Sequence, residues 1–391
     1  MKKGVEVSIA ASIAVQLARA EVISAYPITP QTHIVEHLSE IVANGELDAV
    51  YINVESEHSA MSACCGAAAA GARTFTSSSA QGLELMHEIL FIASGMRLPI
   101  VMAAVNRALS APLSIWGDHS DVMAARDTGW IMLFCENGQE VVDATIMAYK
   151  IAEDRRVLLP VMVNLDGFSL SHVIEPVEFP TQEAVDAFLP PYAPLYTLHP
   201  DKPVTMGAFA MPELYTEAKY AQEMAIINSK EVVMEVMDDF GKQFGRHYKP
   251  VETYNAENAD LVFIVLGAVG ENVKTAIDEL KKEGKNAGLV QLRLFRPFPS
   301  NEILSILKDK KRIAVIERVM PAGAGNGPLF HEISSLLYTH GISVQMENYI
   351  VGLGGRDVLP ESFIDIFNGV AHEKSTVPIT DKNFNVIGVR G

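Results

Sequence analysis

The sequence predicts an α/β protein in which parallel sheets are covered by helices on both faces. Short apolar runs alternate with helical stretches through residues 1–175, and the same alternation returns over residues 251–391. Runs that are rich in β-branched residues and apolar on both faces are typical of strands inside a parallel sheet. The chain has 391 residues, 49% of them hydrophobic, which suits about two or three domains.

The first unit begins with a helix and continues through six strands. The N-terminal stretch carries the charges of Glu6, Arg19 and Glu21, so it is interpreted as an amphipathic helix and not as a signal peptide. Residues 57–71 form an alanine-rich helix whose small side chains permit close packing on a sheet. The expected strands cover residues 22–26, 49–54, 73–76, 99–105, 131–135 and 158–165.

A different pattern separates this unit from the second one. Seven prolines fall between Pro176 and Pro203, which predicts an extended connection over 176–212. Residues 213–245 then form a helix that ends at Gly245. The second unit has expected strands over 260–266, 287–294, 312–317 and 342–346, which alternate with helices over 270–283, 300–310, 328–339 and 360–370.

Charge and cysteine content exclude several classes of function. The chain has 31 Lys and Arg against 48 Asp and Glu, a net charge of −17. A chain this acidic is repelled by nucleic-acid backbones and anionic membranes, so we expect neither as a partner. Its three cysteines show no CxxC spacing, which argues against a disulfide framework or an iron–sulfur site within this chain and suits a reducing cytoplasm.

Ligands of open parallel sheets bind at the carboxyl ends of the strands, so polar residues there are the first candidates. After the first strand, Thr29 lies between Pro27 and Pro30, which stiffen the turn. Two interpretations stay open and are compatible. Thr29 presents its hydroxyl to a ligand, or it caps a helix that starts near Gln31 with Pro30 at the first helical position.

Glu57 follows the second strand and begins a nearly uncharged stretch that runs to Gly71. Apolar surroundings desolvate a carboxyl and favour its protonated form, which suits it to polarise a heterocyclic nitrogen. The alternative is that Glu57 is an ordinary helix-start acid, stabilised by the positive end of the helix dipole.

Two further turns carry polar side chains. The SSSAQG segment over 77–82 follows the third strand, and it either cradles a ligand or simply caps a helix. Arg107 follows the fourth strand and suits bidentate capture of a carboxylate, unless an internal salt bridge to Asp118 or Asp121 holds it. The GDHSD segment over 117–121 invites a metal site, but such groups are often caps and turns, so we expect no metal there.

Taken in order, these segments resemble the α subunit of the 2-oxoacid:ferredoxin oxidoreductases, most closely the pyruvate:ferredoxin oxidoreductase type. YPITPQTHIVEHL, ESEHSAM, TSSSAQGLELMHE and NRALSAPLSIWGDHSDVMAARDTGW resemble a thiamine diphosphate pyrimidine-binding domain. GAVGENVKTAIDEL, LRLFRPFP, IERVMPAGAGNGPLF and VGLGGRDV resemble a domain related to the transketolase C-terminal domain. The resemblance thus implies a pyrimidine-binding domain over 1–175, a Pro-rich connection and helix over 176–250, and a transketolase C-terminal-like domain over 251–391.

The resemblance also implies roles for single residues. Glu57 would contact the aminopyrimidine ring, where a carboxyl that shares a proton with the ring nitrogen assists removal of the proton from thiazolium C2. Thr29 and Arg107 align with residues that hold the carboxylate and keto oxygen of a 2-oxoacid. Ser79, Gln81 and Arg97 lie in motifs that line the cofactor region.

Partner chains are implied as well. Thiamine enzymes usually hold the diphosphate through Mg²⁺ with a GDG motif, and this sequence contains none. We therefore expect a β-type subunit that brings the diphosphate site, Mg²⁺ and a [4Fe–4S] cluster, and γ- and δ-type subunits that bring coenzyme A docking and further clusters. Such an assembly would decarboxylate a 2-oxoacid, with pyruvate favoured, to acyl-CoA and CO₂ and pass the electrons to ferredoxin.

Two kinds of alternative stay open. Branched-chain, aryl, 2-oxoglutarate and oxalate enzymes share this scaffold, although no second arginine for a dicarboxylate is evident near Thr29, which disfavours oxalate. A non-catalytic scaffold paralogue is the alternative from another class. The joint presence of Thr29, Glu57 and Arg107 argues against it.

Overall fold

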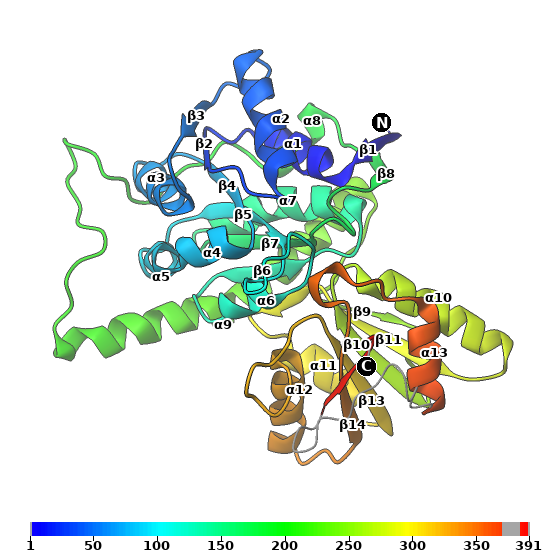
Figure 1. Ribbon diagram of the computed structural model, residues 1–391. Coiled ribbons are helices and arrows are strands. Elements are labelled where there is room, and N and C mark those ends of the chain that lie inside the picture. The colour runs from blue at the N-terminus through cyan, green and yellow to red at the C-terminus, as the bar shows by residue number, and fades with distance from the viewer. Residues whose placement is uncertain (1, 370–383, 390–391) are drawn as a thin grey trace.

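Two large sheets organise the chain in a computed structural model that describes residues 2–369 and 384–389 (Figure 1). A seven-stranded sheet lies in the N-terminal lobe, drawn in blue to green, and a six-stranded sheet lies in the C-terminal lobe, drawn in yellow to red. The predicted α/β class is confirmed in both lobes.

The seven-stranded sheet has the order β12-β6-β7-β5-β4-β2-β3. All six strands expected in the first unit are present and parallel: β2 (Val22–Ala25), β3 (Val50–Asn53), β4 (Thr74–Ser78), β5 (Ile100–Asn106), β6 (Ile131–Phe134) and β7 (Val161–Asp166). The edge strand β12 (Leu294–Arg296) pairs antiparallel with β6 and comes from the second half of the chain. The strand expected over 287–294 is present but ends at Leu292, because the chain then leaves one sheet and covers the open edge of the other.

Helices cover both faces of this sheet, and the alternation along β5 shows how. Val101, Ala103 and Val105 belong to a buried cluster with residues of α1 (Val7–Leu17), α2 (Thr32–Ala43) and α7 (Gly138–Glu153). The alternate residues Ile100, Met102 and Ala104 belong to a second cluster on the other face. That cluster includes residues of α3 (Glu57–Ala69), α4 (Ala80–Leu85), α5 (His87–Gly95) and α6 (Ser120–Ala124). A strand apolar on both faces thus anchors two helical layers.

The chain between the two sheets is more ordered than an extended connection. It begins in β8 (Ile174–Glu178), which pairs antiparallel with β1 (Lys2–Glu6), and it contains α8 (Gln182–Phe188). The N-terminal helix accordingly starts only at Val7, after a strand that sequence reasoning missed. The long helix α9 (Pro212–Phe244) is confirmed, and Gly245 ends it in the left-handed conformation with φ of 73°.

The six-stranded sheet has the order β15-β14-β13-β10-β11-β9. Its strands are β9 (Val251–Tyr254), β10 (Leu261–Leu266), β11 (Ala287–Leu292), β13 (Arg312–Glu317), β14 (Gln345–Ile350) and β15 (Phe384–Val386). Its helices are α10 (Val269–Lys282), α11 (Ser300–Leu307), α12 (Pro328–Thr339), the short 3-10 turn η1 (Leu353–Gly355) and α13 (Pro360–Asn368). The strand expected over 342–346 starts later, because pairing with β13 begins at Gln345. Position 370 of the last expected helix lies outside the described residues.

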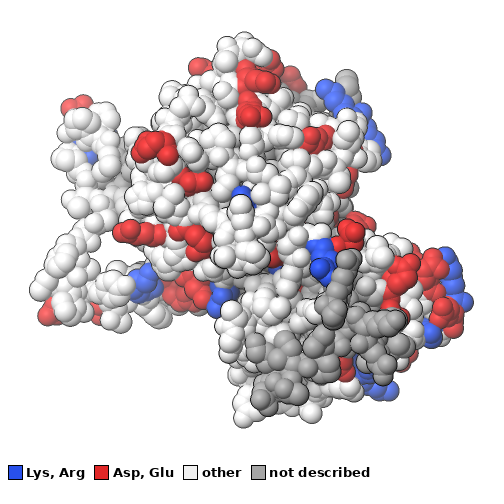
Figure 2. All heavy atoms as spheres, viewed as in Figure 1, with Lys and Arg blue, Asp and Glu red and all other residues white. Residues whose placement is uncertain are grey.

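The charged side chains on the surface reflect the acidic composition of the chain. Figure 2 shows acidic side chains spread over the visible face of both lobes, whereas basic ones gather in small groups, one of them near β1, which carries Lys2 and Lys3. None of the described helices is both long enough and apolar enough to span a bilayer.

A buried ion network joins the two lobes. Asp166, at the end of β7, accepts hydrogen bonds from His119 Nε2 at 2.8 Å, from the Ala268 backbone N–H at 2.7 Å and from the Arg318 guanidinium. Burial by itself raises the pKa of Asp166, but Arg318 and His119 outweigh it and hold that pKa below its usual range. Arg318 also donates to the Gly117 carbonyl at 2.8 Å, so the network ties the second lobe to the turns of the first.

Arg318→Met should destabilise the chain by about 3–5 kcal/mol, because it leaves the buried Asp166 carboxylate with less compensation. The stabilisation that the ionised Asp166 carboxylate provides is present at neutral pH. It is lost as the pH falls below the ordinary aspartate range, since folding lowers the pKa of Asp166. The unfolding midpoint in urea measures the effect. Lys282→Met, which removes an exposed pair with Glu279, is the control, and an equal shift in both variants would contradict the network's role.

Candidate functional site

Four turns that carry the predicted residues meet at one edge of the first sheet. The order β5-β4-β2-β3 places these parallel strands side by side, so their carboxyl ends lie together. Thr29 follows β2, Glu57 follows β3, and Arg107 follows β5. The tertiary structure therefore brings three residues from distant parts of the sequence to one edge.

Glu57 is buried and lacks a charged partner. It is the first residue of α3, next to the N-cap Ser56, whose Oγ accepts from the Ser59 N–H at 3.2 Å. Glu57 is only 6% exposed, and burial raises the pKa of its carboxyl against a smaller opposing effect of its own backbone N–H. No other described residue donates a hydrogen bond to this carboxyl. Glu57 is therefore a helix-start acid that is also desolvated.

The turn after β4 packs closely on Glu57 and carries polar atoms without partners. A Cβ on Gly82 would lie 2.5 Å from Glu57 Oε1 and 2.6 Å from Ser78 Oγ, so only glycine fits without displacing the carboxyl. Ser78 Oγ and Gln81 Oε1 are buried and have no hydrogen-bond partner among the described residues. Buried polar atoms without partners are costly, which is typical of a site that a ligand completes.

Arg107 joins the turns after β2 and β5. Its guanidinium donates to the Thr29 carbonyl at 2.8 Å and to the Ser114 carbonyl at 2.9 Å, and the residue is 6% exposed. The alternative of an internal salt bridge is wrong, because Asp121 accepts from the Arg107 backbone N–H and not from its side chain. Burial lowers the pKa of Arg107, and the charge of Asp121 opposes this in part.

Thr29 is exposed and does not cap a helix. Helix α2 begins at Thr32 with Gln31 at the N-cap position and no side-chain cap, so the capping alternative is wrong. Thr29 is exposed, and no hydrogen bond joins its hydroxyl to the described residues. It is therefore available to a ligand held near Arg107.

Sequence reasoning missed two residues that hold these turns together. Asp121 Oδ2 accepts from the backbone N–H groups of Ala80 and Arg107, both at 2.9 Å, and burial raises the pKa of Asp121 to about 7. Gln31 is fully buried, and its Nε2 donates to the Ser77 carbonyl at 2.8 Å. The sequence shows that each of these polar residues lies beside a turn. It does not show which backbone N–H or carbonyl group each side chain binds.

The remaining predicted residues divide between two edges of the sheet. Ser79 is buried, and its hydroxyl donates to the Val105 carbonyl instead of capping α4, so the simple capping alternative is wrong for it. Gln81 Nε2 donates to Ser110 Oγ at 2.7 Å. Arg97 precedes β5 and therefore lies at the amino edge, where it donates to the Val157 carbonyl at 3.1 Å. Strand polarity thus places Arg97 at the edge opposite to Glu57 and Arg107, so the structure does not bring it together with them.

The GDHSD segment forms turns and ion pairs, as expected. Asp118 Oδ1 accepts from the Ser120 backbone N–H at 2.9 Å. His119 pairs with Asp166, and Asp121 binds backbone N–H groups. Each of the three acid and histidine side chains of this segment thus binds another group of the protein.

Comparisons with known families place both lobes in one group. Residues 13–238 match the family described as pyruvate flavodoxin/ferredoxin oxidoreductase, thiamine diphosphate-binding. Residues 259–363 match the pyruvate:ferredoxin oxidoreductase core domain II.

Curated relatives match along nearly their whole length. Pyruvate synthase subunit PorA of Methanocaldococcus jannaschii is 53% identical over 94% of this chain and 95% of its own. Ketoisovalerate oxidoreductase subunit VorA of Pyrococcus horikoshii is 50% identical over 91% of this chain and 90% of its own.

Solved structures show the same fold. A 2-oxoglutarate:ferredoxin oxidoreductase from Magnetococcus marinus, with 2-oxoglutarate, coenzyme A and succinyl-CoA bound, superposes with a TM-score of 0.71 at 20% identity. The match covers 94% of this chain and 65% of that one. A split-gene transketolase superposes with a TM-score of 0.55 at 12% identity, over 94% of this chain and 98% of that one.

Proposed function

The chain belongs to the pyruvate flavodoxin/ferredoxin oxidoreductase family, and from this premise we propose that its carboxyl edge is half of a thiamine diphosphate site. It is the α-type subunit of a 2-oxoacid:ferredoxin oxidoreductase. The observation that carries the site proposal is Glu57, a buried carboxyl with no partner side chain, placed against the bare backbone of Gly82.

The residues at this edge fit the aminopyrimidine end of the cofactor. When bound, thiamine diphosphate supplies the electron sink for decarboxylation of a 2-oxoacid. Glu57 would hold a proton against a ring nitrogen, since burial raises its pKa and favours the protonated form. Ser78 Oγ and Gln81 Oε1 offer polar atoms on the neighbouring turn. Ser79 would support this turn, because its hydroxyl donates to the Val105 carbonyl of the neighbouring strand.

Arg107 and Thr29 would hold the substrate. The Arg107 guanidinium uses Nε and Nη1 on two carbonyls, which fixes its plane and directs the remaining N–H groups toward a carboxylate. The exposed Thr29 hydroxyl can donate to the keto oxygen. Orientation of a small substrate by two such groups lowers the entropic part of the barrier.

The rest of the active site would come from partner chains. This sequence has no GDG motif and only three cysteines, all buried and free. A β-type subunit would supply the diphosphate site, Mg²⁺ and a [4Fe–4S] cluster, and γ- and δ-type subunits would supply further clusters that reduce ferredoxin. Coenzyme A would accept the acyl group, as the ligands of the Magnetococcus enzyme suggest. Free thiols also suit a reducing cytoplasm.

Pyruvate is the proposed substrate, and a branched-chain 2-oxoacid is the second candidate because a ketoisovalerate oxidoreductase subunit is 50% identical. The test is to purify the complex through a tag on this chain and to assay a panel of 2-oxoacids with coenzyme A and a viologen dye. We expect a brown complex with a cysteine-rich partner and the highest kcat/KM for pyruvate. Preference for 2-ketoisovalerate would overturn the substrate proposal and leave the enzyme class intact, and no turnover with any 2-oxoacid would favour the scaffold alternative.

Gly82→Ala should reduce kcat by about 100-fold without loss of the complex, because the added Cβ displaces the Glu57 carboxyl by about 1 Å. Dye reduction by the assembled enzyme measures the effect. Gly66→Ala is the matched control: Gly66 lies in α3, a Cβ there meets nothing within 4 Å, and alanine favours the helix. Wild-type turnover in Gly82→Ala would argue against the placement of Glu57.

A further inference from the structure

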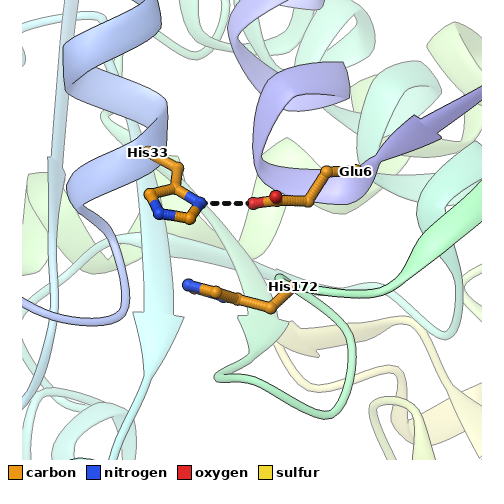
Figure 3. A group of neighbouring side chains, drawn as sticks. All are labelled: Glu6, His33 and His172. Carbon is orange, nitrogen blue, oxygen red and sulfur yellow. Dashed lines mark hydrogen bonds and ion pairs between the residues drawn. The ribbon is translucent and has the colours of Figure 1, made fainter.

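A group of metal-ligating side chains lies outside the proposed cofactor site. Glu6, at the end of β1, His33, in the first turn of α2, and His172, after β7, each offer one ligand atom, and these atoms lie within 4.8 Å of one another. Figure 3 shows His172 lying beneath the His33–Glu6 pair. Three segments that are distant in the sequence therefore converge on one point.

The metal-free group is held by a direct contact that a cation would replace. Glu6 Oε1 lies 2.6 Å from His33 Nδ1, and the two imidazole rings lie 4.6 Å apart between centroids. The His33 side chain is 44% exposed and that of Glu6 25%, so a cation could enter from solvent and keep a water ligand. The described group contains one carboxylate, from Glu6, and two imidazoles.

A second layer of contacts orients His172. Ser171 Oγ lies 2.8 Å from His172 Nδ1 and accepts from the Phe168 backbone N–H at 2.9 Å. The Ser8 hydroxyl binds the Ser171 carbonyl at 2.8 Å, and the Phe168 ring stacks on His172 at 4.5 Å. Ligating histidines typically donate their other ring N–H to such a partner. In the tautomer in which Nδ1–H of His172 donates to Ser171 Oγ, Nε2 would be available to a metal.

The types of side chain in the group indicate which cation would fit. Imidazole binds metals in its neutral form. Two imidazoles and one carboxylate are a ligand set that suits Zn²⁺ and similar cations, whereas Mg²⁺ and Ca²⁺ prefer oxygen ligands.

We propose that Glu6, His33 and His172 bind one divalent cation of the Zn²⁺ class, with water as the fourth ligand. The cation would fasten β1, the start of α2 and the loop after β7 to one another. Because α2 starts directly after the turn that carries Thr29, this fastening would stabilise one side of the proposed substrate site. The proposal does not depend on thiamine diphosphate binding.

The test uses the purified full chain after treatment with a chelator. Titration with ZnCl₂ in excess Mg²⁺, followed by calorimetry, should show one saturable site, and CoCl₂ should give the visible absorption of tetrahedral Co²⁺. Glu6→Gln, His33→Gln and His172→Gln should each weaken binding by more than about tenfold, and Ser171→Ala by about tenfold. His199→Gln, which alters an exposed histidine 3.9 Å from Asp201, should bind like the wild type.

Three results would overturn the proposal. They are absence of saturable Zn²⁺ uptake, wild-type affinity in His33→Gln and His172→Gln, or an octahedral Co²⁺ spectrum that these variants do not change. Circular dichroism without metal checks that each variant folds. If His172→Gln unfolds, His33→Gln decides the matter, because its side chain is half-exposed.

Discussion

In the assembled enzyme, Glu57→Gln should lower kcat by about 10²–10⁴-fold, the range for a positioned group that moves a proton. Glutamine keeps the shape of the buried side chain beside Gly82 but cannot share an ionisable proton with a ring nitrogen. The measurement is viologen reduction with pyruvate at saturating thiamine diphosphate. Size-exclusion chromatography should show the same complex as the wild type, since Glu57 contacts no charged partner in the part of the chain that the structure describes.

Glu55→Gln provides the control for this result. Glu55 lies two residues away, is exposed, and its Oε1 accepts from Ser59 Oγ at 2.5 Å, so its loss should leave kcat unchanged. If Glu57→Gln turned over substrate at the wild-type rate, the proposed cofactor site would be wrong. If both variants were equally slow, the effect would lie in the loop and not in the carboxyl.

Arg107→Lys should raise the KM for the 2-oxoacid and lower kcat, together reducing kcat/KM by about 100-fold or more. Lysine keeps the positive charge but cannot bind the Thr29 and Ser114 carbonyls and still present a planar pair of donors to a carboxylate. Steady-state kinetics with pyruvate measure both constants. An unchanged KM and kcat would show that Arg107 only supports the loop.

Arg97→Lys is the control for Arg107→Lys. It measures how much activity and stability are lost when an arginine bound to backbone carbonyls is replaced away from the proposed substrate site. Like Arg107, Arg97 donates to backbone carbonyls, and burial lowers its pKa. It lies at the amino edge of the sheet, so the variant should lose stability without a change in kinetics. If the variant needed a higher thiamine diphosphate concentration for half-maximal activity, Arg97 would instead contact the cofactor.

Most of the fold was predictable because parallel-sheet strands are apolar on both faces and leave a clear pattern. The six strands β2 to β7 and the helix α9 with its terminal Gly245 follow from that pattern. The strands β1, β8, β9 and β15 were missed. Each is a short strand at a sheet edge or in the small two-stranded sheet, where exposure on one side removes the apolar signal.

The candidate site was predictable to the level of its turns. The rule that ligands bind at carboxyl ends of strands identified Thr29, Glu57 and Arg107. Arg97 came from the motif resemblance, which does not record the edge of the sheet that a residue occupies, and it lies at the other edge. The rule did not reveal the roles of Gln31 and Asp121, which depend on backbone atoms of neighbouring turns.

By itself, the sequence determined the α/β class, the two-sheet organisation and the residues that follow each strand, because these depend on local patterns of apolar and turn residues. Only the tertiary structure decided which of those residues meet, that no side chain among the described residues pairs with the buried Glu57 carboxyl, and that β12 crosses to the first sheet. The physical reason is that desolvation and hydrogen bonding act between neighbours in space, and the strand order that makes them neighbours is set by packing of the whole chain.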